Sequence, residues 1–235
     1  MRKELLELQD AIRPKLKNFN EEDRDEIIIG IRLGSGFGKT HAIVEALKWL
    51  HGKGIYTTYN LKQQLVKDNR HPRQALLIRL ILIMSGATPR SCGTFLATET
   101  ADYFLEDQVT VELLRELFVH CAKSYSLPTQ DLVIGVDETK ELERKSVEII
   151  ISELGHIAHA YYKQTQLMCT VLVTSLVWEN FRTSSGGGVK IWTPKSPDRS
   201  AFEWFAQGVT HMSSLHVTAL FSAVSGSHMR SLAVA

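Results

Sequence analysis

Short runs of apolar, β-branched residues alternate along this chain with longer stretches in which apolar residues recur at helical spacing. The short runs predict five strands, at residues 26–32, 55–60, 132–138, 167–175 and 189–192. The longer stretches predict helices at 1–18, 41–50, 74–85, 95–104, 111–124 and 146–162, with further helices filling the chain after residue 197. The polar segment 61–73 is predicted to be a loop or a frayed helix. Strands separated by helices are typical of an α/β fold with a mostly parallel sheet, and right-handed crossovers place helices on both of its faces.

The connection between the first predicted strand and the next helix is rich in glycine. It reads Leu33-Gly34-Ser35-Gly36-Phe37-Gly38-Lys39-Thr40, and strand, glycine-rich turn and helix form the context of a phosphate-binding P-loop. Glycines let successive N–H groups point at one anion, and the helix start adds the positive end of its dipole. We expect Lys39 to reach the β- and γ-phosphates and Thr40 to place its hydroxyl on Mg²⁺. The expected nucleotide-binding residues of this segment are Gly34, Ser35, Gly36, Phe37, Gly38, Lys39, Thr40 and His41.

The segment departs from the motif G-x-x-x-x-G-K-[ST] at one position, because Leu33 stands where the motif has its first glycine. Either Gly34 takes over the tight turn or the loop is distorted. A glycine-rich connection with a chance Lys-Thr is the structural alternative.

Further polar residues follow two later strands. Asp137 fits a carboxylate that holds Mg²⁺ opposite Thr40, directly or through water, and Glu138 fits the base or orienter of an attacking water. Thr174 or Ser175 is expected at the end of the strand beside the P-loop strand, where ATPases of the AAA+ and STAND type place a residue that senses the γ-phosphate. A solvated strand end and a hydroxyl that caps the next turn are the alternatives.

These features predict one nucleotide site, because ligands of such sheets bind at the carboxyl ends of the strands. Lys39, Asp137 and Glu138 are the expected catalytic residues, and Thr40 and Asp137 the expected metal-binding residues. The GTPase motif N-K-x-D is absent from the sequence, which favours ATP as the nucleotide.

The composition limits which classes of protein this chain can belong to. The 235 residues are 44% apolar, which is enough for one large domain. The formal charge of +1 gives no global electrostatic field that would recruit nucleic acid or an anionic membrane. The cysteines Cys92, Cys121 and Cys169 are scattered, which predicts reduced thiols rather than disulfides or a zinc site. The charged N-terminus is not a secretory signal, and no apolar run is long enough to span a membrane. We therefore expect an intracellular protein, in cytoplasm or nucleus, without a membrane partner.

Several landmarks in chain order carry a family resemblance. They are Tyr59-Asn60, the helix with Arg79, Val136-Asp137-Glu138, Trp192-Thr193-Pro194 and the segment Ser225-Gly226-Ser227-His228-Met229-Arg230-Ser231-Leu232. From about residue 26 to the end, the chain resembles the P-loop ATPase domain of Crinkler effectors and retrotransposon-hot-spot (RHS) proteins. The last segment looks like that family's G-G-H-P-R-x-L segment, with Ser227 and Met229 in place of its second glycine and its proline. Residues 226–229 also match a common vector scar.

The resemblance implies an AAA+/STAND-like ATPase in which Mg-dependent ATP hydrolysis drives a conformational change or assembly. It implies that Arg230 is a sensor arginine that contacts the γ-phosphate, since its planar fork binds phosphate oxygens bidentately. It also implies a protein or nucleic-acid partner and, for an effector, a location in the host cell. We expect an N-terminal helix and turn (1–22), a P-loop core (23–206) and a small helical C-terminal segment (207–235).

Two other functions stay open at this point. The first is a P-loop kinase, against which the glycine-rich segment 182–195 counts because it is poor in arginine. The second is an interaction module that binds nucleotide without turnover, or none at all. If the protein assembles into a homo-oligomeric ring, Arg144, Arg182 and Arg199 are candidates for a trans-acting arginine finger.

Overall fold

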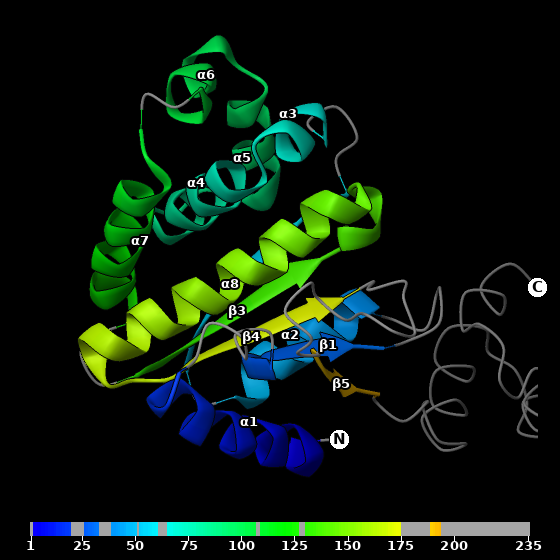
Figure 1. Ribbon diagram of the computed structural model, residues 1–235. Helices are drawn as coiled ribbons and strands as arrows, with labels where there is room; N and C mark the ends of the chain where they lie inside the picture. Colours follow the sequence, from blue (N-terminus) through cyan, green and yellow to red (C-terminus); the bar gives the residue numbers. More distant parts are fainter. Residues whose placement is uncertain are drawn as a thin grey trace, which may run out of the picture.

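The chain folds around a five-stranded, entirely parallel sheet with the strand order β2–β3–β4–β1–β5 (Figure 1). The computed structural model describes residues 2–19, 26–32, 39–50, 52–60, 65–106, 109–126, 130–174 and 189–193. The elements are α1 (Arg2–Lys17), β1 (Ile28–Ile31), α2 (Lys39–Trp49), β2 (Gly52–Thr58), α3 (Leu65–Arg70), α4 (Pro72–Met84), α5 (Pro89–Leu96), α6 (Glu99–Leu105), α7 (Val111–Ser126), β3 (Asp131–Asp137), the short 3-10 helix η3 (Thr139–Glu141), α8 (Arg144–Thr165), β4 (Cys169–Thr174) and β5 (Lys190–Trp192). The α/β class predicted from the sequence is confirmed.

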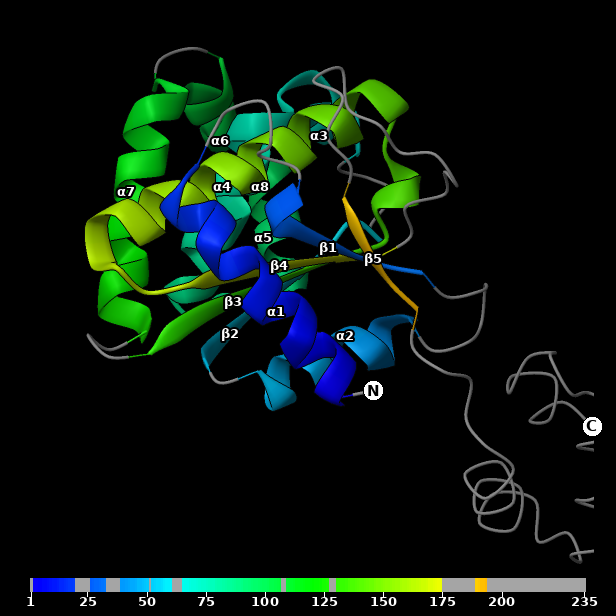
Figure 2. The same cartoon turned by 60° about the horizontal axis from the view of Figure 1, so that its bottom comes forward.

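Helices cover both faces of the sheet, as predicted. Helices α1 and α2 lie on one face, and α4 and α8 lie on the other, with α7 packed against both of the latter (Figures 1 and 2). On the first face, Gly54 and Gly135 leave room for the α2 side chains Leu47 and Ile43, and Gln9 of α1 donates a hydrogen bond of 2.9 Å to Thr170 of β4. Burial on both faces explains why β3 and β4 read as continuous apolar runs.

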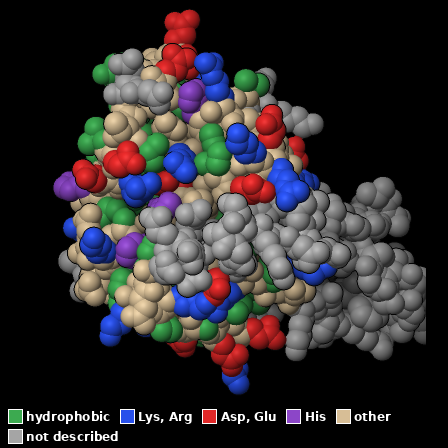
Figure 3. Space-filling model, in the orientation of Figure 1, with side chains coloured by type: hydrophobic (Ala, Val, Ile, Leu, Met, Phe, Trp, Pro, Cys, Tyr) green, Lys and Arg blue, Asp and Glu red, His purple; other side chains and the backbone are tan. Residues whose placement is uncertain are grey.

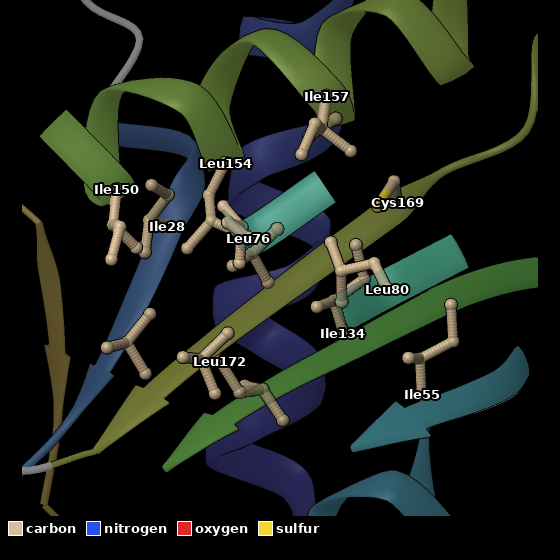
Figure 4. Close-up of a cluster of buried hydrophobic side chains, with 14 of the residues drawn as sticks. Ile28, Ile55, Leu76, Leu80, Ile134, Ile150, Leu154, Ile157, Cys169 and Leu172 are labelled. Carbon is tan, nitrogen blue, oxygen red and sulfur yellow. The ribbon is translucent and has the colours of Figure 1, made fainter. Parts of the chain in front are cut away.

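The larger part of the core lies between the sheet and the helices α4 and α8. Strand residues such as Ile28, Ile55 and Ile134 meet side chains of both helices, and all of them are fully buried (Figure 4). The helical contribution comes from Leu76, Leu80, Ile150, Leu154 and Ile157. Because each such side chain stabilises the fold by about 1.5–3 kcal/mol on full burial, this layer holds the strand ends in fixed relative positions.

The helical layer beside β2 differs from the sequence-based prediction in two ways. The segment expected to form one helix over 95–104 is two helices, because α5 begins at the capping box of Thr88 and ends before Thr98, which precedes α6. The polar segment 61–73 contains α3, which is fixed by a buried ion pair between Asp68 and Arg79 of α4, with N···O distances of 3.1 and 2.7 Å. Tertiary pairing of this kind leaves no periodic signal in a short polar segment.

The limits of strand β2 also differ from those predicted. The strand was expected over residues 55–60, but it begins at Gly52 and ends at Thr58, pairing with β3 along its full length. Residues 52–54, which lie between the predicted helix over 41–50 and the predicted strand, are thus part of the sheet. None of the helices that the structure describes is both long and apolar enough to cross a membrane.

Candidate functional site

Polar residues gather where the central strands end. Strand β4 lies between β1 and β3, and its last residue, Thr174, pairs with Ile31 of β1. One position earlier, Val173 pairs with Val136 of β3, immediately before Asp137. Because the strands are parallel, their carboxyl ends meet at one edge of the sheet, and helix α2 begins at Lys39 after β1. The predicted neighbourhood of β1 and the strand that ends in Thr174 is confirmed.

The carboxylate of Asp137 is the centre of this edge. It is buried, and each of its oxygens accepts two hydrogen bonds. Oδ2 accepts from the hydroxyl of Thr40 at 2.6 Å and from the phenol of Tyr56 at 3.0 Å. Oδ1 accepts from the backbone N–H of Glu138 at 2.9 Å and from the hydroxyl of Thr174. Four donors from four different segments therefore fix the orientation of one carboxylate.

Thr174 connects the end of β4 to the turn that follows β3. Besides its contact with Asp137, its Oγ1 lies 3.2 Å from the backbone nitrogen of Glu138. Its carbonyl accepts a hydrogen bond of 2.7 Å from Thr139. Both threonines are fully buried. The hydroxyl of Thr174 thus belongs to the network around Asp137.

Glu138 has a backbone conformation that is uncommon for a residue other than glycine. Its φ and ψ are 58° and 36°, in the left-handed region. Its Oε2 is buried and has no hydrogen-bond partner among the residues that the structure describes, although Lys140 Nζ lies 3.3 Å away as an ion pair. A strained backbone that persists at a site is a reason to look for function there.

The other sequence-predicted residues at the start of α2 surround this network. Thr40 is exposed apart from its hydrogen bond to Asp137, Lys39 is half-buried, and His41 lies exposed on the first turn. Arg144, a candidate arginine finger, begins α8 and pairs with Glu148 of the same helix at 3.1 Å. The remaining predicted residues, Gly34, Ser35, Gly36, Phe37, Gly38, Ser175, Arg182, Arg199 and Arg230, lie outside the described residues.

Tyr56 is the site residue that sequence reasoning missed. It lies on β2 opposite Gly135, and Asp137 is the diagonal neighbour two residues farther along β3. A long aromatic side chain reaches a diagonal neighbour on the same face of a sheet. The β-forming residues at 55–58 were the available signal for a strand. That β2 lies beside β3 is decided by the fold. Burial, followed by the charge of Asp137, raises the pKa of the Tyr56 phenol, which therefore stays a proton donor at neutral pH.

The oxygen atoms of this edge suit a hard cation that keeps most of its water. Within the described part of the chain, no three His, Cys, Asp or Glu side chains gather as a metal site. The Thr40 hydroxyl, however, donates its hydrogen bond to Asp137 and the residue is exposed, so its oxygen can face a cation. Mg²⁺ in phosphate-binding sites takes few protein oxygens and keeps several waters. The donor set fits Mg²⁺ bound by Thr40, with Asp137 acting through that hydroxyl and through water.

Comparison with known proteins adds no assignment to this geometry. No protein-family model matches the sequence, and no match was found among curated proteins.

Proposed function

We propose that this protein is a Mg-dependent P-loop ATPase of the AAA+/STAND-like kind. The observation on which the proposal rests is the hydrogen bond of 2.6 Å between Thr40 and Asp137, which lie 97 residues apart. It joins the Lys-Thr pair at the start of α2 to the carboxylate at the end of β3. These two sequence features were identified separately, and their contact is the one that a P-loop ATPase requires.

Each described residue then has a part in binding or hydrolysis. Lys39 at the N-terminus of α2 binds phosphate oxygens, where backbone N–H groups and the helix dipole also favour an anion. Thr40 presents a hydroxyl that Asp137 orients. Thr40, and Asp137 through water, would hold Mg²⁺, which would supply positive charge to neutralise phosphate oxygens. Glu138 would orient a water or take its proton, and Thr174 holds Asp137 and the backbone of Glu138 in place.

The position of Thr174 supports an AAA+/STAND-like ATPase over a kinase. β4 separates β1 from β3, and its terminal hydroxyl lies directly beside the acidic pair. Glu138 beside it supplies a carboxylate for activating water. Coupling of hydrolysis to conformational change or assembly, a protein or nucleic-acid partner, and the relation to Crinkler and RHS proteins belong to the same proposal and rest on the sequence resemblance.

The test is calorimetric titration of the purified protein with Mg-ATPγS, beside the variants Lys39→Ala and Lys48→Ala. Both lysines are on α2, but Lys48 lies at the far end of the helix and pairs with Glu45. A charge-assisted hydrogen bond is worth about 1.5–3 kcal/mol, so Lys39→Ala is expected to weaken binding about 10–100-fold. Lys48→Ala is expected to bind like the parent.

A folded parent protein that does not bind Mg-ATPγS contradicts the proposal. With binding established, phosphate release from ATP in buffer alone supports an ATPase. ATP consumption that requires an added acceptor, to which the γ-phosphoryl group is transferred, indicates the kinase instead. Binding without ATP consumption indicates a module that has lost turnover.

A further inference from the structure

The Asp137 carboxylate has a donor that the nucleotide-binding motifs do not include. Tyr56 projects from β2, which stands at one end of the strand order, and its phenol lies 3.0 Å from Asp137 Oδ2. That oxygen is the one that also accepts the Thr40 hydroxyl. Strands β2 and β4, the residue after β3 and the start of α2 thus each donate a hydrogen bond to a single side chain.

The two donors on Oδ2 have different consequences for the site. Thr40 is the expected cation-binding residue, so its hydroxyl must keep a defined direction while its lone pairs face outward. If Thr40 were the sole donor to Oδ2, rotation of the Asp137 carboxylate about its Cβ–Cγ bond would change the direction of the Thr40 hydroxyl. A second donor on Oδ2 opposes that rotation, together with the two donors on Oδ1. Groups that orient a metal-binding residue commonly change metal affinity or activity about 10–100-fold when removed.

We propose that Tyr56 is a positioning residue for the cation-binding part of this site, an inference that rests on the proposed function. Its hydroxyl fixes Asp137 so that Thr40 is presented to Mg²⁺ bound with the nucleotide. Gly135 lies opposite Tyr56 on β3 and carries no side chain, and Ile43 and Leu47 of α2 contact that position. The Tyr56 phenol therefore extends from β2 toward Asp137 of β3, on the face of the sheet that α2 covers.

The chain provides a matched control for removal of this hydroxyl. Tyr125 of α7 is also half-buried, and its phenol donates a hydrogen bond of 2.9 Å to the carbonyl of Gly54 on the same strand. Tyr56→Phe and Tyr125→Phe thus remove the same atom and one hydrogen bond to or from β2. Only the first of the two touches Asp137.

The experiment is calorimetric titration of the full chain with ATPγS, in Mg²⁺ and separately in EDTA, for the parent and both variants. Tyr56→Phe is expected to lose about tenfold in affinity in Mg²⁺ and to match the parent in EDTA. Tyr125→Phe is expected to match the parent in both. A purely structural role would lower both affinities of Tyr56→Phe together.

The outcomes separate this inference from the proposed function. If the parent binds and Tyr56→Phe keeps the parent's dependence on Mg²⁺, the positioning role is overturned and the ATPase proposal is untouched. Equal losses in the two variants, or a loss that persists in EDTA, overturn it as well. Absence of binding by the folded parent overturns both proposals.

Discussion

At the scale of single residues, Glu138 combines a strained, left-handed backbone with a carboxylate at the proposed site. A left-handed conformation costs roughly 1–2 kcal/mol for a residue other than glycine. Here it is held by two hydrogen bonds of the Glu138 backbone N–H, to Asp137 Oδ1 and Thr174 Oγ1. Gln166, at the end of α8, has a nearly identical φ of 60° but lies away from this network. The two residues form a natural pair for separating strain from function.

We predict that Glu138→Gly leaves the protein folded and abolishes turnover. Glycine adopts positive φ without a steric penalty, so the free energy of unfolding is expected to stay equal or to rise by up to about 1 kcal/mol. Glu138→Gln, which keeps the size of the side chain, is expected to bind Mg-ATP and to hydrolyse it about 10²–10⁴-fold more slowly. Denaturant unfolding and phosphate release measure the two effects.

The control for this pair of variants is Gln166→Gly. It relieves the same backbone strain at a helix C-terminus, where glycine is preferred, so it should stabilise the protein by a similar amount and leave turnover unchanged. Turnover by Glu138→Gln at the parent's rate would remove Glu138 from the mechanism.

At the scale of elements, the start of strand β2 shows how a glycine is needed for strand pairing. A Cβ atom on Gly52 would lie 2.4 Å from the carbonyl oxygen of Asp131, the residue with which it pairs on β3. A Cβ on Gly54, two residues later on the same face, would meet Leu47 of α2 at 3.4 Å, an ordinary contact. The first glycine permits a close approach of two backbones, and the second only faces a helix.

We predict that Gly52→Ala lowers the free energy of unfolding by about 1–3 kcal/mol, because backbone must shift to admit the methyl group. Gly54→Ala is expected to change it by less than about 1 kcal/mol, since Leu47 can adjust and alanine restricts the unfolded chain. Urea unfolding of both variants checks this. Equal effects would mean that β2 and β3 separate at Gly52 without cost.

At the scale of the whole molecule, the cysteines report on the packing of the three layers. Cys169 on β4 and Cys92 on α5 are buried, whereas Cys121 on α7 is partly exposed. Burial raises the pKa of both the Cys169 and the Cys92 thiols, so their thiolate fraction at a given pH falls. Basic and acidic side chains are interspersed on the face of the molecule shown in Figure 3. The formal charge of +1 leads one to expect such a mixture.

We predict that iodoacetamide at pH 8 modifies Cys121 in the folded protein, and that Cys92 and Cys169 react only after denaturation. The thiolate is the reactive species, and both buried thiols are inaccessible and have a pKa raised by burial. Intact-mass measurement over time distinguishes one modification from three, and Cys121→Ser should leave the folded protein almost unmodified. Modification of Cys169 at the rate of Cys121 would mean that the core around β4 opens readily.

The sequence alone was sufficient for the class of fold and for the residues that stand at its strand ends. Apolar runs covered on both faces mark β3 and β4 without ambiguity, and a polar residue directly after such a run must lie at the edge of the sheet. Asp137, Glu138 and Thr174 could therefore be named in advance. Lys39 and Thr40 could be named because their motif is local.

Only the tertiary structure decided which of these residues touch, because contact depends on the order of the strands. The order β2–β3–β4–β1–β5 places Thr174 beside one oxygen of the Asp137 carboxylate, and it places Thr40 and Tyr56 within reach of the other. The buried pair of Asp68 and Arg79 was equally beyond the sequence, since a charged residue in a short polar segment reads as exposed. Local patterns determine where a strand or helix forms, whereas the hydrogen bonds of the site depend on residues that are brought together from distant parts of the chain.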